Sequence, residues 1–167
     1  EMADALSLLI SAGRHAVPAP LAETMLAGWL LSGAGLGMPE GPLAAAGPLT
    51  VAPVRENERL RARRDGAGWR IEGTATRIPW GRQCGAIAVL AEGDGKNVVA
   101  LVAAADVVVK DGHNLAGEPR DDLVFSGAIA QQAGVATNAG DALRALGAVV
   151  RSAQMAGALQ GVLEATV

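Results

Sequence analysis

Cysteine is nearly absent from the sequence, and this excludes several kinds of stabilisation and chemistry. Cys84 is the single cysteine among 167 residues. One thiol can form neither an internal disulfide nor a cysteine-based metal site. A chain without disulfides suits a reducing compartment, so we expect the protein in the cytoplasm.

Aromatic residues are also scarce, with three Trp, one Phe and no Tyr. Half of the residues are hydrophobic, and most of these are alanine, valine and leucine. The core must therefore consist of small aliphatic side chains in close packing. The richness in alanine, glycine and arginine is typical of a GC-rich bacterial gene.

No strong charge excess and no long apolar run is present. The net charge of -3 gives no electrostatic footprint for nucleic acid. A local basic run, Arg59 to Arg64, is interpreted as the solvated face of a strand. No apolar segment approaches the roughly 18 to 20 residues that span a bilayer, and no signal peptide is recognisable. We therefore expect a soluble protein without a membrane span.

Helical periodicity marks both ends of the chain. Apolar residues at helical spacing predict a helix over 1–13 and a second from Pro20 to about Ser32. A third helix is predicted after Asp141, which is a plausible N-cap, and it continues to Val167. Because the first helix starts without an initiator methionine and the last is still running at Val167, we expect the natural chain to extend at both ends.

The middle of the chain has the period of β-strands. Apolar and polar residues alternate on both sides of the Gly-rich turn Asp65–Gly68, which predicts a β-hairpin. Around Ile87–Leu90 the sequence is almost continuously apolar, which predicts a strand covered on both faces. The predicted strands cover 43–46, 60–64, 69–77, 86–91, 97–102, 107–110, 122–126 and 130–135.

These patterns together predict an α+β protein with N-terminal helices, an antiparallel β sandwich or barrel, and one long C-terminal helix. No helix-length crossover lies between the strands, which favours antiparallel pairing. The corresponding units are 1–42, 43–137 and 138–167.

Four local strings resemble the acyl-CoA dehydrogenase family. Residues 62–73, ARRDGAGWRIEG, resemble the hairpin of its middle domain, and 118–127, EPRDDLVFSG, a later strand of that domain. Residues 145–164 are similar to the first helix of its C-terminal domain, and 21–24, LAET, to part of its N-terminal helical domain. The resemblance covers almost the whole chain in the same order.

The resemblance implies an oxidoreductase of lipid or fatty acid metabolism. Such a flavoprotein oxidises an acyl-CoA substrate to its enoyl-CoA with FAD, using a glutamate base. In the family the middle domain covers the flavin ring. The C-terminal helices supply the base, part of the cofactor site and the oligomer contacts, so a homo- or hetero-oligomer is implied.

Residues of the implied flavin site depart from the family pattern. The Thr-Glu-Pro stretch and its Gly-Ser loop survive only as Thr50. The aromatic-Ile-Ser/Thr triplet aligns with Arg77, Ile78 and Pro79, and Pro79 brings neither a hydroxyl nor an N–H. Trp80 is suited to stack on a flavin or to cap the core, and we favour the core.

The implied cofactor-binding residues are therefore Thr50, Ile78, Pro79 and Trp80. No residue matches the catalytic base, so this chain is expected to be inactive alone. The alternative is a non-catalytic partner subunit, or a binding or assembly module, that retains the β scaffold.

The remaining candidates are interpreted as structural. His15 and His113 lie in predicted linkers without neighbouring ligands, so no metal site is predicted. Asp121 and Asp122 are assigned to a turn and a strand start. Cys84 has no activating neighbour and is interpreted as a small apolar residue.

Overall fold

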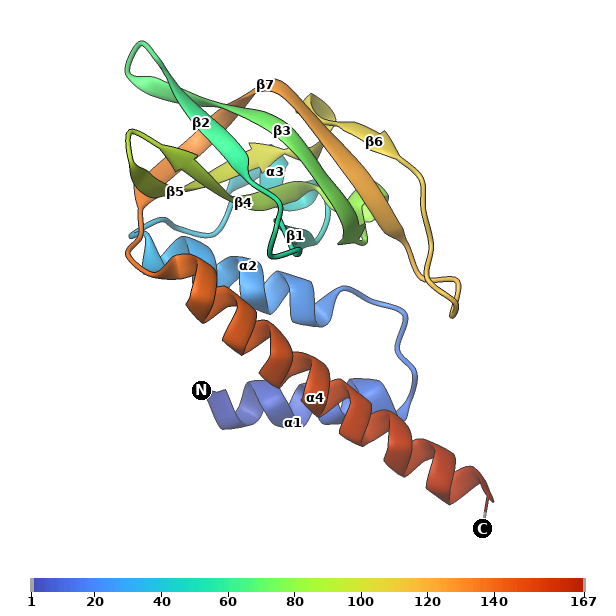
Figure 1. Ribbon diagram of the computed structural model, residues 1–167. Coiled ribbons are helices and arrows are strands. Elements are labelled where there is room, and N and C mark those ends of the chain that lie inside the picture. The colour runs from blue at the N-terminus through green and yellow to red at the C-terminus, as the bar shows by residue number, and fades with distance from the viewer. Residues whose placement is uncertain (1, 167) are drawn as a thin grey trace.

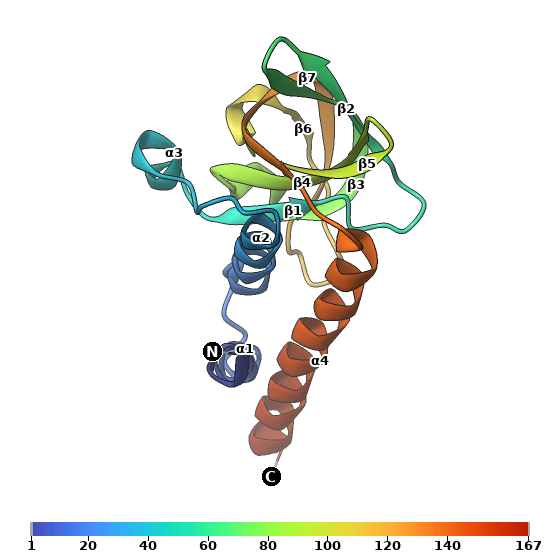
Figure 2. The same ribbon diagram turned by 90° about the vertical axis from the view of Figure 1, so that its left-hand side faces the viewer.

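A curled β-sheet forms the upper half of the molecule, and the three long helices lie together beneath it (Figure 1). The computed structural model describes residues 2–166. The long helices are α1 (Met2–Arg14), α2 (Leu21–Gly33) and α4 (Ala139–Thr166). In Figure 2, α2 and α4 lie side by side under the sheet, and the short helix α3 (Gly41–Ala45) projects to one side.

Seven strands make up the sheet. They are β1 (Leu49–Ala52), β2 (Leu60–Asp65), β3 (Gly68–Pro79), β4 (Ala86–Gly93), β5 (Lys96–Ala103), β6 (Val108–Lys110) and β7 (Arg120–Val135). The α+β class with a middle β domain and a long last helix is confirmed.

The sheet closes on itself around β4. One edge of β4 pairs with β5, while its other edge pairs first with β1 and then with β2. The circuit returns from β2 through β3 and β7 to β5. Strands β1 and β2 pair with the same edge of β4, one after the other. Residues 53–59, which connect them, therefore leave the sheet. This departure makes an opening in the barrel wall.

The prediction of a purely antiparallel sheet is wrong at β4. Both β1 and β2 run parallel to β4, whereas the other pairings are antiparallel. Parallel strands are usually joined by a helical crossover, and no helix-length segment separates these strands in the sequence. Here the connection from β1 to β4 runs through the β2–β3 hairpin instead, which closing the barrel makes possible.

Three local predictions are also wrong. Residues 43–46 belong to helix α3 and the following turn, because Pro42 sits at the helix start, where its missing N–H costs nothing. The predicted strands 122–126 and 130–135 are one strand, since Gly127 (φ 81°) bends β7 without ending it. Helix α4 begins at Ala139, so Asp141 lies in its first turn and is not its N-cap.

Two layers of small aliphatic side chains form the core, as the composition predicts. One lies inside the barrel around Ile71, Ile87 and Leu123; the other lies between the sheet and the helices around Leu9, Leu30 and Leu101. Alternate residues of β4 enter the two layers, so this strand is covered on both faces as predicted.

The unit boundaries 42/43 and 137/138 remain a proposal, and the first of them falls within α3. The expected continuation of the last helix at Val167 lies outside the described residues. Over residues 2–166, no helix combines the length and the apolarity needed to cross a membrane.

Candidate functional site

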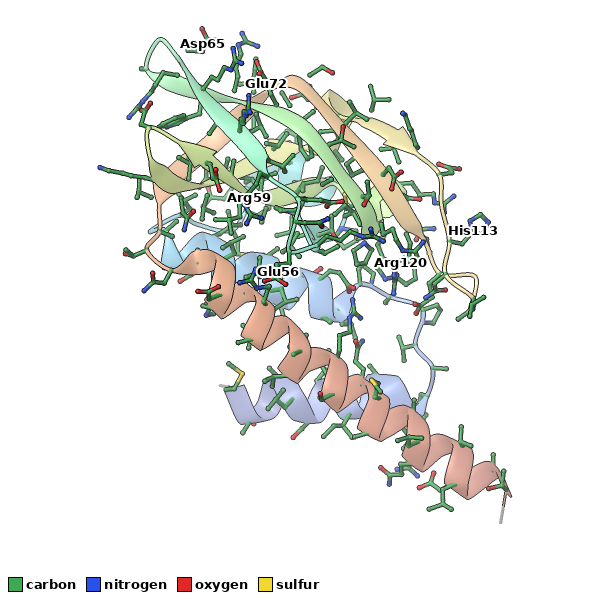
Figure 3. The ribbon with its side chains drawn as sticks, in the orientation of Figure 1. Glu56, Arg59, Asp65, Glu72, His113 and Arg120 are labelled. Atoms are coloured by element: carbon green, nitrogen blue, oxygen red, sulfur yellow. The ribbon has the colours of Figure 1, made fainter. Side chains whose placement is uncertain are left out.

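A cleft of about 560 Å³ lies where the opening in the barrel wall faces the helices. Its walls are the loop 53–59, the ends of β1 and β3, one face of α2 and the first turns of α4. In Figure 3, Glu56, Arg59 and Arg120 lie on the side of the β domain that faces the helices, whereas Asp65 and Glu72 lie toward its far side.

A bulge in β3 lies beside the loop 53–59. Ala75 pairs with Leu123 and Ile78 with Asp121, so β3 carries one extra residue between these two pairs. The carboxylate of Glu58 accepts hydrogen bonds from the N–H (3.1 Å) and the hydroxyl of Thr76. These bonds tie the loop 53–59 to strand β3.

Two of the four predicted cofactor residues are joined directly. The hydroxyl of Thr50 donates a hydrogen bond to the carbonyl oxygen of Pro79 at 2.7 Å, and Thr50 is fully buried. Ile78 is also fully buried, and Trp80 is 8% exposed. Only Pro79 among the four lines the cleft.

Thr50, Ile78 and Pro79 therefore offer no free side-chain donor to a flavin, whereas the indole N–H of Trp80 has no hydrogen-bond partner among the described residues. The Thr50 hydroxyl is already paired, Pro79 has no N–H, and the other two side chains lie in the core. At the cleft itself, the one side chain among these four is that of Pro79, and it is apolar. That they bind the cofactor stays a prediction.

The hydrogen bond of Thr50 has a measurable consequence. Thr50→Val keeps the shape of the side chain but removes the donor to Pro79, and we expect the free energy of unfolding to fall by about 1 kcal/mol. Urea denaturation of the two proteins measures this difference. An unchanged midpoint would mean that the hydroxyl does not tie β1 to β3.

A half-buried ion pair that sequence reasoning missed lies on the helical wall of the cleft. Glu23 on α2 is 1% exposed, and its Oε1 accepts a hydrogen bond from Arg151 on α4. The other oxygen, Oε2, is buried without a partner among the described residues. The one sequence signal was a single charged residue, Glu23, in a largely apolar helix.

The cleft is lined by many charged side chains, and not all of them are paired. Six arginines and five carboxylates line it, although the whole chain has a net charge of -3. Most are paired: Arg59 with Glu92, Arg144 with Asp141, and Arg151 with Glu23. Within residues 2–166, the guanidinium groups of Arg55 and Arg77 have neither an ion pair nor a hydrogen bond.

The other candidate residues lie outside the cleft. His15 and His113 are exposed, and no metal-binding cluster of His, Cys, Asp and Glu occurs within residues 2–166. Asp121 is fully buried, and its carboxylate accepts hydrogen bonds from the backbone N–H groups of Arg82 and Gly112. Its role is structural, because these bonds hold the start of β7.

Cys84 is buried, and its Sγ donates a hydrogen bond to the carbonyl of Gly81 at 3.1 Å. Desolvation raises the pKa of this thiol from 9.0 to about 12. We expect no alkylation by iodoacetamide at about pH 8 unless the protein is unfolded, since the thiolate is the nucleophile.

The same pKa shift makes stability depend on pH. The unfolded chain ionises Cys84 at a lower pH than the folded protein, so stability is lost as pH rises from 9.0 toward 12. Cys84→Ala should lose less stability over this range. Rapid labelling of the folded protein would contradict the buried position.

Comparison with solved structures places this arrangement in a class. The chain is similar over 97% of its length to a chain of the ChsE4-ChsE5 complex from Mycobacterium tuberculosis, with 27% identity and a TM-score of 0.82. It is similar over 97% to the Tcur3481-Tcur3483 steroid ACAD G363A variant, with 21% identity and a TM-score of 0.79. In both cases it covers 48% of the other chain.

A third similarity is to a glutaryl-CoA dehydrogenase from Mycobacterium smegmatis in complex with FADH2. It covers 62% of this chain and 28% of that one, with 24% identity and a TM-score of 0.52. No family model matches the sequence, and no curated protein matches it.

The fold is thus similar to that of acyl-CoA dehydrogenases, as the resemblance predicted. More particularly, the chain is similar to chains of two-component complexes, and it spans about half the length of those relatives.

Proposed function

We propose that this chain is part of an FAD-dependent acyl-CoA dehydrogenase that introduces an α,β double bond into an acyl-CoA thioester. The observation that carries the proposal is the similarity to the ChsE4-ChsE5 complex, which extends over 97% of the chain at 27% identity. No residue of this chain is assigned as the catalytic base, so we do not expect dehydrogenation by this chain alone.

The oligomer and the substrate are part of the same proposal. Two of the relatives are two-component complexes, which supports a hetero-oligomer of related subunits. One of them is a steroid ACAD, so the acyl group belongs to lipid metabolism in a broad sense that includes steroid as well as fatty acyl groups. The proposed compartment is the cytoplasm.

A second candidate function is that of a non-catalytic partner subunit that retains the β scaffold. The observation that favours it is the hydrogen bond from Thr50 to Pro79, which uses the only hydroxyl among the predicted flavin residues. In this case a related subunit would carry the flavin and the base, and this chain would complete the complex.

The test combines the full-length protein with a homologous partner subunit. We expect flavin absorbance and enoyl-CoA formation, assayed with one fatty and one steroid acyl-CoA, to be much higher in the co-purified complex than in either subunit alone. Activity that survives when the partner's predicted base is replaced would favour catalysis by this chain. A mixture without flavin and without activity would contradict both candidate functions.

A further inference from the structure

We propose that Arg77, with Arg120 beside it on the paired strand and Arg55 in the loop 53–59, binds an oxyanionic group of the ligand that enters the cleft. An oxyanionic group here means a phosphate or a carboxylate. The inference rests on the proposed function in one respect, namely that the cleft is the ligand site. Beyond the proposed function, it states that the ligand carries a negative charge where it contacts the β domain.

The backbone of β3 directs Arg77 into the cleft. Arg77 is the bulged residue, and it adopts a left-handed conformation with φ 55°, which is uncommon for residues other than glycine, asparagine and aspartate. Such backbone strain persists where surrounding contacts hold it, and it clusters at functional sites. Here Asp122 holds it, because its carboxylate accepts a hydrogen bond from the Arg77 N–H at 2.9 Å.

The nearby carboxylates do not neutralise Arg77. Asp122 accepts the backbone N–H of Arg77, and both oxygens of Glu58 accept hydrogen bonds from Thr76. The bulge therefore uses two carboxylates to hold the main chain and leaves the guanidinium without a partner among the described residues. A guanidinium directed into a cleft in this way matches the geometry of a carboxylate or a phosphate.

Arg120 adds a second donor at the same wall. It lies opposite Pro79 in the β3–β7 register, so it is close to Arg77 along the same strand pair. Its side chain is 17% exposed and is held by Glu118 (2.9 Å) and by the carbonyl of Pro119 (2.8 Å). Arg120 is thus already ordered before a ligand arrives, which lowers the entropy cost of binding.

Arg55 supplies the second unpaired charge from the loop 53–59, which also lines the cleft. Six arginines and five carboxylates line the cleft, and Glu118, the partner of Arg120, lies just beyond the lining, so the unpaired positive charge there comes from Arg55 and Arg77. Unpaired charges of one sign in a cleft attract ligand groups of the other sign. Arg55 and Arg77 are exposed, like other surface arginines, but they line one cleft, and the experiment measures whether this position matters.

The experiment titrates the full chain with inorganic pyrophosphate and, separately, with glutarate, at ionic strength matched by sodium chloride. We expect at least one of the two anions to raise the urea midpoint of unfolding in a saturable manner, as linkage requires. A larger effect of pyrophosphate identifies a phosphate group on the ligand, and a larger effect of glutarate identifies a carboxylate.

Arg77→Asn removes the guanidinium but keeps a residue that tolerates the left-handed conformation. We expect this variant to bind the effective anion about tenfold more weakly, and Arg55→Gln to weaken it as well. Arg61→Gln is the matched control, since Arg61 is an exposed arginine on β2 outside the cleft, and its response should equal that of the wild type.

The proposal is overturned if neither anion stabilises the chain beyond sodium chloride, or if Arg77→Asn responds like Arg61→Gln. Should Arg77→Asn not fold, Arg55→Gln decides the matter by the same criterion. No flavin or acyl thioester is used, so a failure here leaves the proposed dehydrogenase untouched. Loss of the dehydrogenase proposal would likewise leave the measured anion binding in place.

Discussion

Replacing Arg151 by methionine is expected to lower the free energy of unfolding by about 3 kcal/mol. The substitution keeps much of the aliphatic volume but leaves Glu23, which is 1% exposed, without its counter-charge. Removing one partner of a buried ion pair costs about 3–5 kcal/mol. The lower end applies because the Arg151 side chain is 40% exposed and water reaches it. Urea denaturation of wild type and variant near neutral pH measures the loss.

Two further variants show whether the loss comes from the buried charge. Arg144 is the matched control on the same helix, because its partner Asp141 is 84% exposed, and Arg144→Met should change stability by less than about 0.5 kcal/mol. Adding Glu23→Gln to Arg151→Met should recover part of the loss, since it removes the buried charge. Equal losses in the two methionine variants would contradict the assignment.

Gly157→Ala is expected to lower the free energy of unfolding by about 2–3 kcal/mol. A Cβ at this position of α4 would lie 1.8 Å from the carbonyl oxygen of Ile10 and 2.9 Å from the backbone nitrogen of Arg14, both on α1. Backbone atoms cannot rotate away as a side chain can, so α1 must move, and overpacking of this kind costs about 1–3 kcal/mol. Moving α1 also exposes Leu9, which is fully buried.

The control for this prediction lies on the same helix. A Cβ added at Gly147 meets nothing within 4 Å, so Gly147→Ala should raise stability by about 0.5–1 kcal/mol through helix propensity. Thermal or urea unfolding of the two variants decides the matter. If both variants were stabilised, α1 and α4 would not cross as closely in solution as the structure has them.

Much of the fold could be predicted from the sequence because its signals are local. The hairpin of β2 and β3 follows from alternation on both sides of a Gly-rich turn, and the registers Arg61 with Glu72 and Arg63 with Arg70 agree with that pairing. The predicted helices 1–13 and 20–32 differ from α1 and α2 by about one residue at each end within the described range.

The errors concern the extent of β7 and the pairing of β4. The sequence predicts separate strands over 122–126 and 130–135, yet Gly127, with φ 81°, bends one continuous strand between them. The parallel pairings of β4 were missed because a turn specifies only which consecutive strands become neighbours. The residues of β1 and β2 do not indicate which distant strand each of them pairs with.

The candidate site was accessible to sequence reasoning only in part. Thr50 and Pro79 were identified from the resemblance, and the structure joins them through a hydrogen bond. Glu23 and Arg151 are 128 residues apart, and Arg77 was noted only as a departure from a motif. The role of each of these residues depends on whether it has a partner. Only the folded chain shows that.

The sequence alone determined the order of helices and strands, the core of small aliphatic side chains and the resemblance to a known family. These follow from periodicity, turn residues and short strings, which are properties of neighbouring residues. Only the tertiary structure decided which strands run parallel, where the barrel wall opens, and which charges remain unpaired in the cleft. The physical reason is that pairing and burial depend on segments that are distant along the chain, and their contacts exist only after the barrel closes and α4 packs on α1 and α2.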